Sequence, residues 1–135
     1  MSAGFPNLFV ITGPGSPSVL VNMVIGIEQH VDWIADCLAH LREHGFSRID
    51  ADAAAEQRWG EHVDATAQRT LFPRANSWYM GANIPGKPRQ FMLYVQKIGV
   101  YRKECDAAAQ QGYQGFHLSR HETAASQQPQ SARCA

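Results

Sequence analysis

One apolar periodicity sets most of what this chain of 135 residues can fold into. Between residues 20 and 41, large apolar side chains recur at steps of four and three, the spacing of one helix face. His44 closes the pattern, and Gly45 suits the position just past a helix end. The sequence therefore predicts a long amphipathic helix. The residues of its apolar face are Leu20, Val24, Ile27, Val31, Ile34, Leu38 and Leu41.

The segment ahead of this helix is typical of a buried strand that runs into a tight turn. Residues Leu8–Ile11 are apolar without alternation, as in a parallel strand covered on both faces. Glycines and prolines at residues 13–17 then force the turn. Such a strand needs neighbours on both edges, and the other convincing strand, Gln90–Val95, lies far downstream. Either the strand assignment is wrong or the chain is one end of a larger protein.

Further elements are predicted by local signals. Asp52 can cap a second helix that ends near Thr70. Gly99–Gln111 is predicted as a third helix, stopped by Gly112, and Tyr113–Leu118 as a short strand. The residues of the second helix expected to face inward are Trp59, Val63 and Ala67.

Composition excludes several classes of protein. The 12 basic and 12 acidic side chains give no net charge, so no surface-wide field points to nucleic acid or to an anionic membrane. There is no apolar run of membrane-spanning length, and we expect no signal peptide because the N-terminus lacks a basic segment followed by an apolar one. The 3 cysteines lack metal-site or redox spacing and indicate free thiols in the cytoplasm. Residues 119–135 are rich in Gln, Ser and Ala, and we expect a disordered tail.

The turn Gly13–Ser18 resembles the opening of the dinucleotide-binding fingerprint GxGxxG, but Ser18 occupies the position of the third glycine. No second strand ending in an acidic residue follows about 20 residues later, which argues against a pyrophosphate site. A glycine-rich turn before a helix N-terminus still offers free N–H groups and the positive end of a dipole. A carbonyl or a partly anionic ring could sit there, and a plain strand–helix turn is the alternative.

The histidines and serines do not form a recognisable catalytic or metal-binding pattern. His40 and His44 share a helix face, but no third ligand is evident, and they and His30 are expected to be solvated at the surface. Ser16 and Ser18 lack the context of a nucleophile elbow. We therefore assign no metal ligand and no catalytic residue.

Asn76–Lys87 is an irregular segment that carries Trp78 and Tyr79 among glycine and proline. Aromatic side chains on such loops are often ligand or interface contacts. The alternative is a loop that tucks Trp78 into the nearest groove, and composition alone does not decide between the two.

Taken together and in register, these motifs resemble the C-terminal part of Baeyer–Villiger monooxygenases. These are class B flavin monooxygenases of the cyclohexanone and phenylacetone monooxygenase type. The resemblance covers about residues 3 to 118, and it departs from the family at Gln96–Lys97, where two glycines are usual. The matching stretches are Gly4–Phe9, Gly13–Ser18, Asn22–Met23, Ile27–Trp33, Ser77–Trp78, Gly81–Lys87, Phe91–Val95, Tyr101–Arg102 and Gly112–Phe116.

The resemblance implies an α/β fold: the C-terminal part of a two-Rossmann-domain flavoprotein that binds FAD and NADP. Residues 1–45 would be the last strand and helix of the FAD-binding domain, and residues 46–118 the C-terminal helices and final strands. The chain holds neither Rossmann fingerprint, so Met1 is expected to be an internal or truncated start. The fragment would be mostly helical, with an incomplete sheet, and its partner would be the missing N-terminal portion.

The resemblance also implies an activity, insertion of one oxygen from O2 into a ketone to give an ester or lactone. The isolated chain would be inactive and would hold no catalytic residue. The implied sites are FAD contacts at Gly13, Pro14, Asn22 and Met23, a substrate pocket at Pro17, Ser18, Val19, Leu20 and Met23, and an NADP-covering loop (residues 76–87) with contacts at Trp78, Asn83 and Lys87. The alternatives are a flavin monooxygenase that oxygenates nitrogen or sulfur and a non-enzymatic interaction module.

Overall fold

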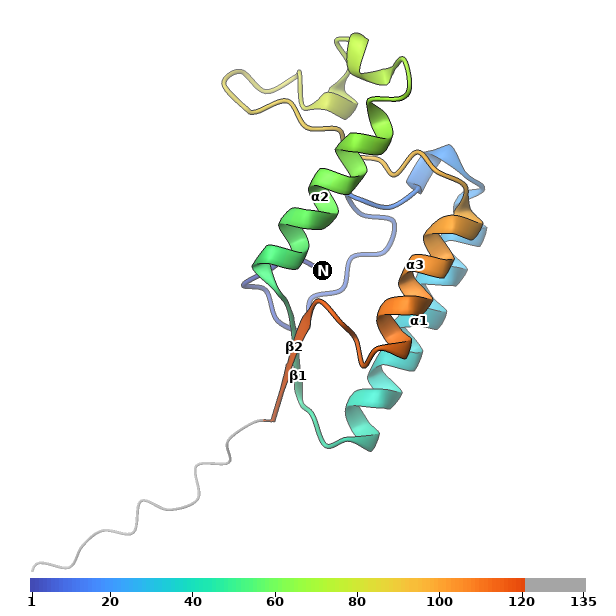
Figure 1. Ribbon diagram of the computed structural model, residues 1–135, viewed down its shortest axis with the longest axis vertical. Coiled ribbons are helices and arrows are strands. Elements are labelled where there is room, and N and C mark those ends of the chain that lie inside the picture. Colours follow the sequence, from blue (N-terminus) through green and yellow to red (C-terminus); the bar gives the residue numbers. More distant parts are fainter. Residues whose placement is uncertain (121–135) are drawn as a thin grey trace, which may run out of the picture.

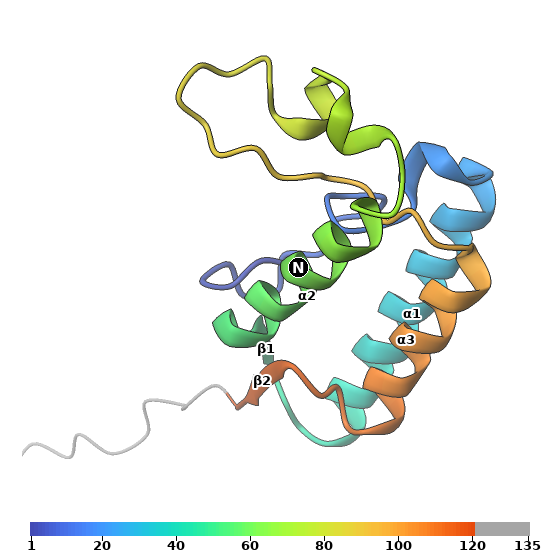
Figure 2. The same cartoon turned by 45° about the horizontal axis from the view of Figure 1, so that its top comes forward.

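The computed structural model describes residues 1–120. Helices α1 and α3 lie side by side, and α2 runs apart from this pair (Figure 1). Part of the N-terminal segment lies between α2 and the pair in Figure 1, and the turned view shows another part crossing behind α2 (Figure 2). The elements are α1 (Met23–Glu43), β1 (Arg48–Ala51), α2 (Ala53–Ala67), α3 (Ile98–Gln110) and β2 (Phe116–Ser119), with single 3-10 turns at Ser18–Leu20, Phe72–Arg74 and Trp78–Met80.

The long helix predicted from periodicity is α1, and both of its ends follow from local chemistry. The Asn22 side chain caps the start by accepting a hydrogen bond from the Val24 amide at 3.0 Å. At the other end Gly45 adopts a φ of 66°, and the Phe46 amide donates to the Leu41 carbonyl at 2.8 Å. This is a Schellman ending, for which glycine is the favoured residue.

Most of the predicted apolar face of α1 is uncovered within residues 1–120. Val24, Ile27 and Val31 are 61%, 39% and 46% exposed. Leu41 is the one residue of the predicted face that is buried, and the other buried residues of the helix are Gly26, Gln29 and Cys37. The periodic face is therefore real, but the described chain supplies no layer to cover it.

Two strand predictions are wrong. Leu8–Ile11 forms no strand, and Val10 is 50% exposed, because no neighbouring strand is available to pair with it. Gln90–Val95 contributes one isolated parallel bridge, between Leu93 and Ser16, and no ladder. Both runs are apolar enough for strands, yet ladder hydrogen bonds require partners that residues 1–120 do not provide.

The sheet that does form is a two-stranded antiparallel pair, β1 with β2, in which Arg48 lies opposite Ser119. β2 overlaps the predicted strand at Tyr113–Leu118, and β1 was not predicted. β2 also takes in Ser119, the first residue of the expected tail, while residues 121–135 lie outside the described part.

The other two helices agree with prediction, with small shifts at their ends. Asp52 caps α2, because its side chain accepts a hydrogen bond from the Ala55 amide at 2.8 Å. This helix ends at Ala67, short of the expected Thr70. α3 is followed by Gly112 at a φ of 68°, which agrees with a glycine stop.

Two small apolar clusters stabilise the arrangement. One joins α1 to the sheet through Cys37, Leu41, Ile49 and Tyr113. The other joins the end of α2 to the segment that follows it, through Ala67, Met80, Phe91 and Leu93. Among residues 1–120, no helix combines the length and the apolar character needed to cross a membrane.

Candidate functional site

The glycine-rich turn leaves no room for side chains at its two glycines. A Cβ at Gly13 would lie 2.6 Å from Cγ1 of Val10, and a Cβ at Gly15 would lie 2.7 Å from Nε1 of Trp59. Gly15 also has a φ of 79°. Both glycines are therefore required by the path of the turn itself, because protein atoms already fill the space beside them.

Two helices hold this turn by their side chains. The Thr12 amide donates to Nδ1 of His30 on α1 at 3.0 Å. On the other side, Nε1–H of Trp59 on α2 donates to the Gly15 carbonyl at 3.1 Å. The turn is thus bonded to both α1 and α2.

Residues 91–94 hold the turn from a third direction through backbone hydrogen bonds. The Gly15 amide donates to the Met92 carbonyl at 2.8 Å, and the Tyr94 amide donates to the Ser16 carbonyl at 2.9 Å. The Met92 amide in turn donates to the Tyr79 carbonyl at 3.1 Å. Met92 therefore connects the two segments that the sequence singled out, the turn and the loop that carries Trp78.

The start of α1 lies directly after the turn. Asn22 is occupied as the helix cap, so its side chain serves the helix. The first-turn amides of any helix lack partners within the helix and present a positive dipole end. Met23 is 38% exposed at this end. The geometry suits a negatively polarised group placed against the helix start.

The predicted substrate-pocket residues divide into covered and open ones. Pro17 is fully buried and Ser18 adopts a φ of 42° in the 3-10 turn. Val19 and Leu20 are 52% and 38% exposed, so with Met23 they present an apolar surface. Val19, Leu20 and Met23 are thus accessible to a neighbouring group, whereas Pro17 is not.

The loop at residues 76–89 is tied at its ends and open at its tip. Arg89 donates to Oδ1 of Asn76 at 2.6 Å, which closes the loop, and Met80 is buried in the second apolar cluster. Trp78 is 58% exposed, with its ring centroid 3.9 Å from that of Tyr79. Figure 2 shows the loop standing away from the helices.

The other two candidate residues of this loop are both exposed. Asn83 lies near the tip, and the stem of Lys87 passes over Gly81, where an added Cβ would be 3.5 Å from Cδ of the lysine. The structure keeps Trp78, Asn83 and Lys87 on one loop and accessible.

His30 is not the solvated surface residue that the sequence predicted. Its Nδ1 accepts from Thr12, so in the neutral ring the proton is on Nε2, which lies 3.0 Å from the hydroxyl of Tyr101 on α3. Burial, with a smaller contribution from the N-terminal ammonium, lowers the pKa of His30. The ring therefore favours the neutral form. Its partner Tyr101 lies 71 residues away, so no local pattern could have revealed this contact.

Trp59 and Tyr94 form a second arrangement that the sequence did not reveal. Their rings stack at a centroid distance of 5.5 Å, and the Tyr94 hydroxyl donates to Oε2 of Glu104 at 2.7 Å. Burial raises the pKa of Tyr94 above its ordinary value, and the bond to Glu104 adds to this. Trp59 is therefore held in the orientation that bonds Gly15. The sequence predicted that it faces inward, but not its partner.

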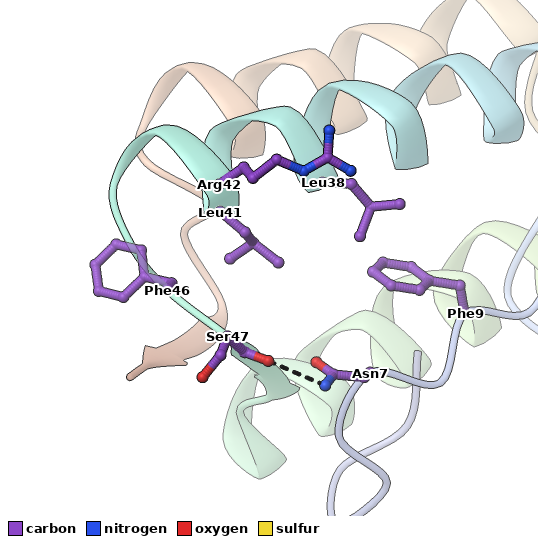
Figure 3. Close-up of a pocket in the computed structure, with 7 residues that line it drawn as sticks. All are labelled: Asn7, Phe9, Leu38, Leu41, Arg42, Phe46 and Ser47. Atoms are coloured by element: carbon purple, nitrogen blue, oxygen red, sulfur yellow. Dashed lines mark hydrogen bonds between the residues drawn. The ribbon is translucent and has the colours of Figure 1, made fainter. Parts of the chain in front are cut away.

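Two hollows of the surface lie away from these residues. One, of about 420 Å³, is shown in Figure 3: Phe9 faces Leu38 and Leu41 of α1, and the Asn7 side chain donates to the Ser47 carbonyl. Another, of about 640 Å³, lies between α2 and residues 88–90. Neither contains a predicted site residue. The described residues also hold no group of three or more potential metal ligands.

Comparison with known proteins gives a consistent set of relatives. No family model matches the chain. The chain is 41% identical over 120 residues to an acetone monooxygenase of Gordonia, which covers 88% of this chain and 22% of the relative. It is 40% identical over 113 residues to a Baeyer–Villiger monooxygenase of Pseudooceanicola batsensis, covering 84% of this chain and 20% of the relative.

Solved structures agree with these relatives. A steroid monooxygenase bound to NADP superposes with a TM-score of 0.79 and 43% identity over 87% of this chain and 21% of its own. A complex of OTEMO with FAD and NADP superposes with a TM-score of 0.76 and 33% identity. The match covers 88% of this chain and 21% of the OTEMO chain. The chain thus spans about a fifth of the length of its relatives.

The relatives are not uniform in the reaction that their names describe. A phenazine N-monooxygenase of Lysobacter antibioticus is 32% identical over 117 residues, covering 87% of this chain and 21% of the relative. The matched stretch therefore occurs with a nitrogen oxygenase as well as with ketone oxygenases.

Proposed function

The chain belongs to the Baeyer–Villiger monooxygenase family over the fifth of those enzymes that it spans, and from this premise we propose that it works as part of a FAD- and NADPH-dependent monooxygenase. The whole enzyme inserts one oxygen atom from O2 into a small-molecule ketone and forms an ester or a lactone. The isolated chain is inactive, because its sequence holds neither Rossmann fingerprint. The observation that carries the proposal is the 41% identity to an acetone monooxygenase over 120 residues.

The residues of the turn and helix start fit a flavin. FAD activates O2 in such enzymes, and NADPH supplies the hydride. Here Gly13, Pro14, Asn22 and Met23 would border the pyrimidine side of the flavin, where the dipole at the start of α1 favours negative charge. In this proposal residues 1–45 belong to the FAD-binding domain.

The remaining candidate residues take the substrate and the second cofactor. The exposed side chains of Val19, Leu20 and Met23 would form an apolar wall of the substrate pocket, supported by Pro17 and Ser18. Trp78, Asn83 and Lys87 would contact NADP from the NADP-covering loop, residues 76–87, within the C-terminal region of residues 46–118. The exposed indole supports this role, since it offers a large apolar face and one N–H donor.

The uncovered face of α1 fits the same proposal. Its apolar side chains would pack against the rest of the enzyme, the missing N-terminal portion of the chain, which makes that portion the principal partner. We place the enzyme in the cytoplasm, in keeping with its free thiols.

A chimera tests the proposal. Residues 3–118 replace the matching stretch of the Gordonia acetone monooxygenase, and the purified chimera is assayed for bound FAD and for ketone-dependent NADPH consumption. We expect FAD near one per chain and conversion of a ketone to an ester. The parent enzyme is the control. A well-folded chimera without FAD would contradict the proposal.

The second candidate is oxygenation of a nitrogen heterocycle, which the phenazine N-monooxygenase relative favours. Offering the chimera a ketone and a phenazine side by side separates the two. Oxygen transfer to phenazine nitrogen, with no ester formed, would support the second candidate over the first.

A further inference from the structure

Thr12 opens the glycine-rich turn in a backbone conformation that its residue type disfavours. Its φ is 53°, in the left-handed region. A β-branched residue there is a true outlier, and such strain persists only where the surroundings hold it in place. Something next to Thr12 must therefore stabilise this conformation.

The neighbour that does so is His30. Its Nδ1 accepts the Thr12 amide hydrogen at 3.0 Å, and the contact is partly buried. Without it the amide would lose its hydrogen bond in a position where water has limited access. The amide lies one residue ahead of Gly13, which stands at the start of the turn proposed to face the flavin.

The ring of His30 is oriented by a directional chain of hydrogen bonds. With Nδ1 accepting, Nε2–H donates to the Tyr101 hydroxyl at 3.0 Å. The Thr12 amide can only donate, so it fixes the tautomer of His30, and Tyr101 on α3 then accepts from Nε2–H and holds the ring in its orientation.

We propose that His30 is a positioning residue for the flavin-facing turn: its neutral ring, oriented by Tyr101, holds the Thr12 amide and keeps residues 12–16 in their strained shape. This rests on the proposed function, because it assumes that FAD lies against the turn. His30 itself does not touch the cofactor. It acts through Thr12.

The test uses the same chimera with substitutions at His30 and a matched control. His30→Leu removes both ring nitrogens, whereas His30→Asn keeps an acceptor, Oδ1, at the distance of Nδ1 from the backbone. His44→Asn changes an exposed histidine at the end of the same helix. The measurements are the dissociation constant of FAD, the circular dichroism of the bound flavin, and the KM for NADPH.

We expect His30→Leu to weaken FAD binding roughly tenfold, as for loss of one hydrogen bond that leaves a donor unpaired, and to alter the flavin dichroism. His30→Asn and His44→Asn should stay within about threefold of the unsubstituted chimera, and the KM for NADPH should not change. If His30→Asn restores FAD binding, the hydrogen-bond acceptor matters. If His30 only filled space, leucine would fill it equally well and His30→Leu would bind FAD normally.

Other outcomes overturn the inference in distinguishable ways. If His30→Leu binds FAD like the unsubstituted chimera, or if His30→Asn is as weak as His30→Leu, the inference is wrong and the proposed function stands. If the unsubstituted chimera holds no FAD, the proposed function fails and the inference fails with it. Should His30→Leu not fold, Tyr101→Phe replaces it, with weaker FAD binding as the expected result and unchanged binding as the contrary one.

Discussion

The turn at residues 12–16 and the loop at residues 76–89 are both rich in glycine and proline, but they are held very differently. The turn is hydrogen-bonded to the side chains of His30 and Trp59 and to the backbone of residues 91–94. The loop is tied at its base by Asn76 and by buried Met80, and its tip is exposed.

This difference separates two kinds of functional segment that look alike in sequence. A turn bonded from three sides can hold a bound group in one geometry, whereas a loop fixed only at its base can move toward and away from a ligand. The backbone of Met92 is hydrogen-bonded to Tyr79 in the loop and to Gly15 in the turn. Movement of the loop would therefore be transmitted to a residue that also anchors the turn. Each experiment below tests one side of this comparison.

The largest effect concerns the turn as a binding site on its own. We expect the isolated chain to hold no FAD after gel filtration. A helix N-terminus contributes roughly 0.3 to 1 kcal/mol toward a charge at an exposed site, whereas micromolar affinity needs about 8 kcal/mol. The FAD that is retained is measured by flavin absorbance of the gel-filtered protein. A content near one FAD per chain would contradict this prediction and show that the turn alone is sufficient to bind FAD.

The next effect compares alanine at two glycines with nearly the same backbone. Gly15 and Gly86 have φ values of 79° and 77°, but an added Cβ would meet Trp59 at Gly15 and nothing within 4 Å at Gly86. Both substitutions incur left-handed strain of roughly 1–2 kcal/mol. Gly15→Ala adds overpacking, so it should lower the free energy of unfolding by a further 1–3 kcal/mol or so. The free energy of unfolding of both alanine variants is measured by urea unfolding. Equal losses at Gly15 and Gly86 would mean that the turn can relax as freely as the loop.

In the complete enzyme, Trp78→Ala should impair use of NADPH more than retention of FAD. The indole is exposed on a loop fixed at its base, so its loss should weaken closure over the cofactor, by roughly tenfold in kcat/KM for NADPH. Stopped-flow flavin reduction and coupling of NADPH use to product, measured in the chimera, report this. Loss of FAD with normal reduction kinetics would make the loop structural.

A smaller effect separates the two tryptophans by phenylalanine substitution. Trp59→Phe keeps stacking on Tyr94 but removes the donor to Gly15, which should cost about 1 kcal/mol of unfolding free energy. Trp78→Phe should cost almost nothing, because this indole is 58% exposed. Thermal unfolding of the two variants side by side would contradict the comparison if Trp78→Phe were the more damaging.

The sequence predicted the helices well because their signals are local. Gly45 and Asp52 act on amides and carbonyls a few residues away, so the end of α1 and the start of α2 could be read directly. The cap at Asn22 was not predicted, and Leu20, where the apolar pattern was expected to begin, lies in a 3-10 turn ahead of α1. The short, polar strand β1 carries no such signal, since its pairing partner lies near the other end of the described chain.

The failures arise where a residue depends on a distant partner. Leu8–Ile11 is apolar enough for a strand, but strand formation requires neighbours that residues 1–120 lack. The role of His30 depends on Tyr101, and that of Trp59 on Gly15. The candidate site was therefore located by its glycine-rich segments, while the side chains that hold it were visible only after folding.

The smallest effect is a dependence of the turn on pH. The pKa of His30 is lowered in the folded chain, so below its unfolded value of about 6.5 the unfolded chain binds more protons than the folded one. The contribution of His30 to the free energy of unfolding is therefore complete above that pH. It declines as the pH falls from the unfolded pKa toward the lower pKa of the folded chain. The groups facing His30 are the Thr12 amide, the Tyr101 hydroxyl and, through space, the N-terminal ammonium; the pKa of Tyr101 is raised, so the phenol stays neutral throughout.

Protonation of Nδ1 would remove the acceptor for Thr12 and loosen the turn, whereas the loop has no histidine and should not respond. Amide hydrogen exchange at Thr12 and Gly15, corrected for the intrinsic pH dependence of exchange, should therefore lose protection on acidification, with Met80 and Gly81 as internal controls. His30→Asn should abolish the loss, because its amide oxygen accepts without titrating. A parallel loss at turn and loop, or its persistence in His30→Asn, would place the titration in another group and leave the turn independent of His30.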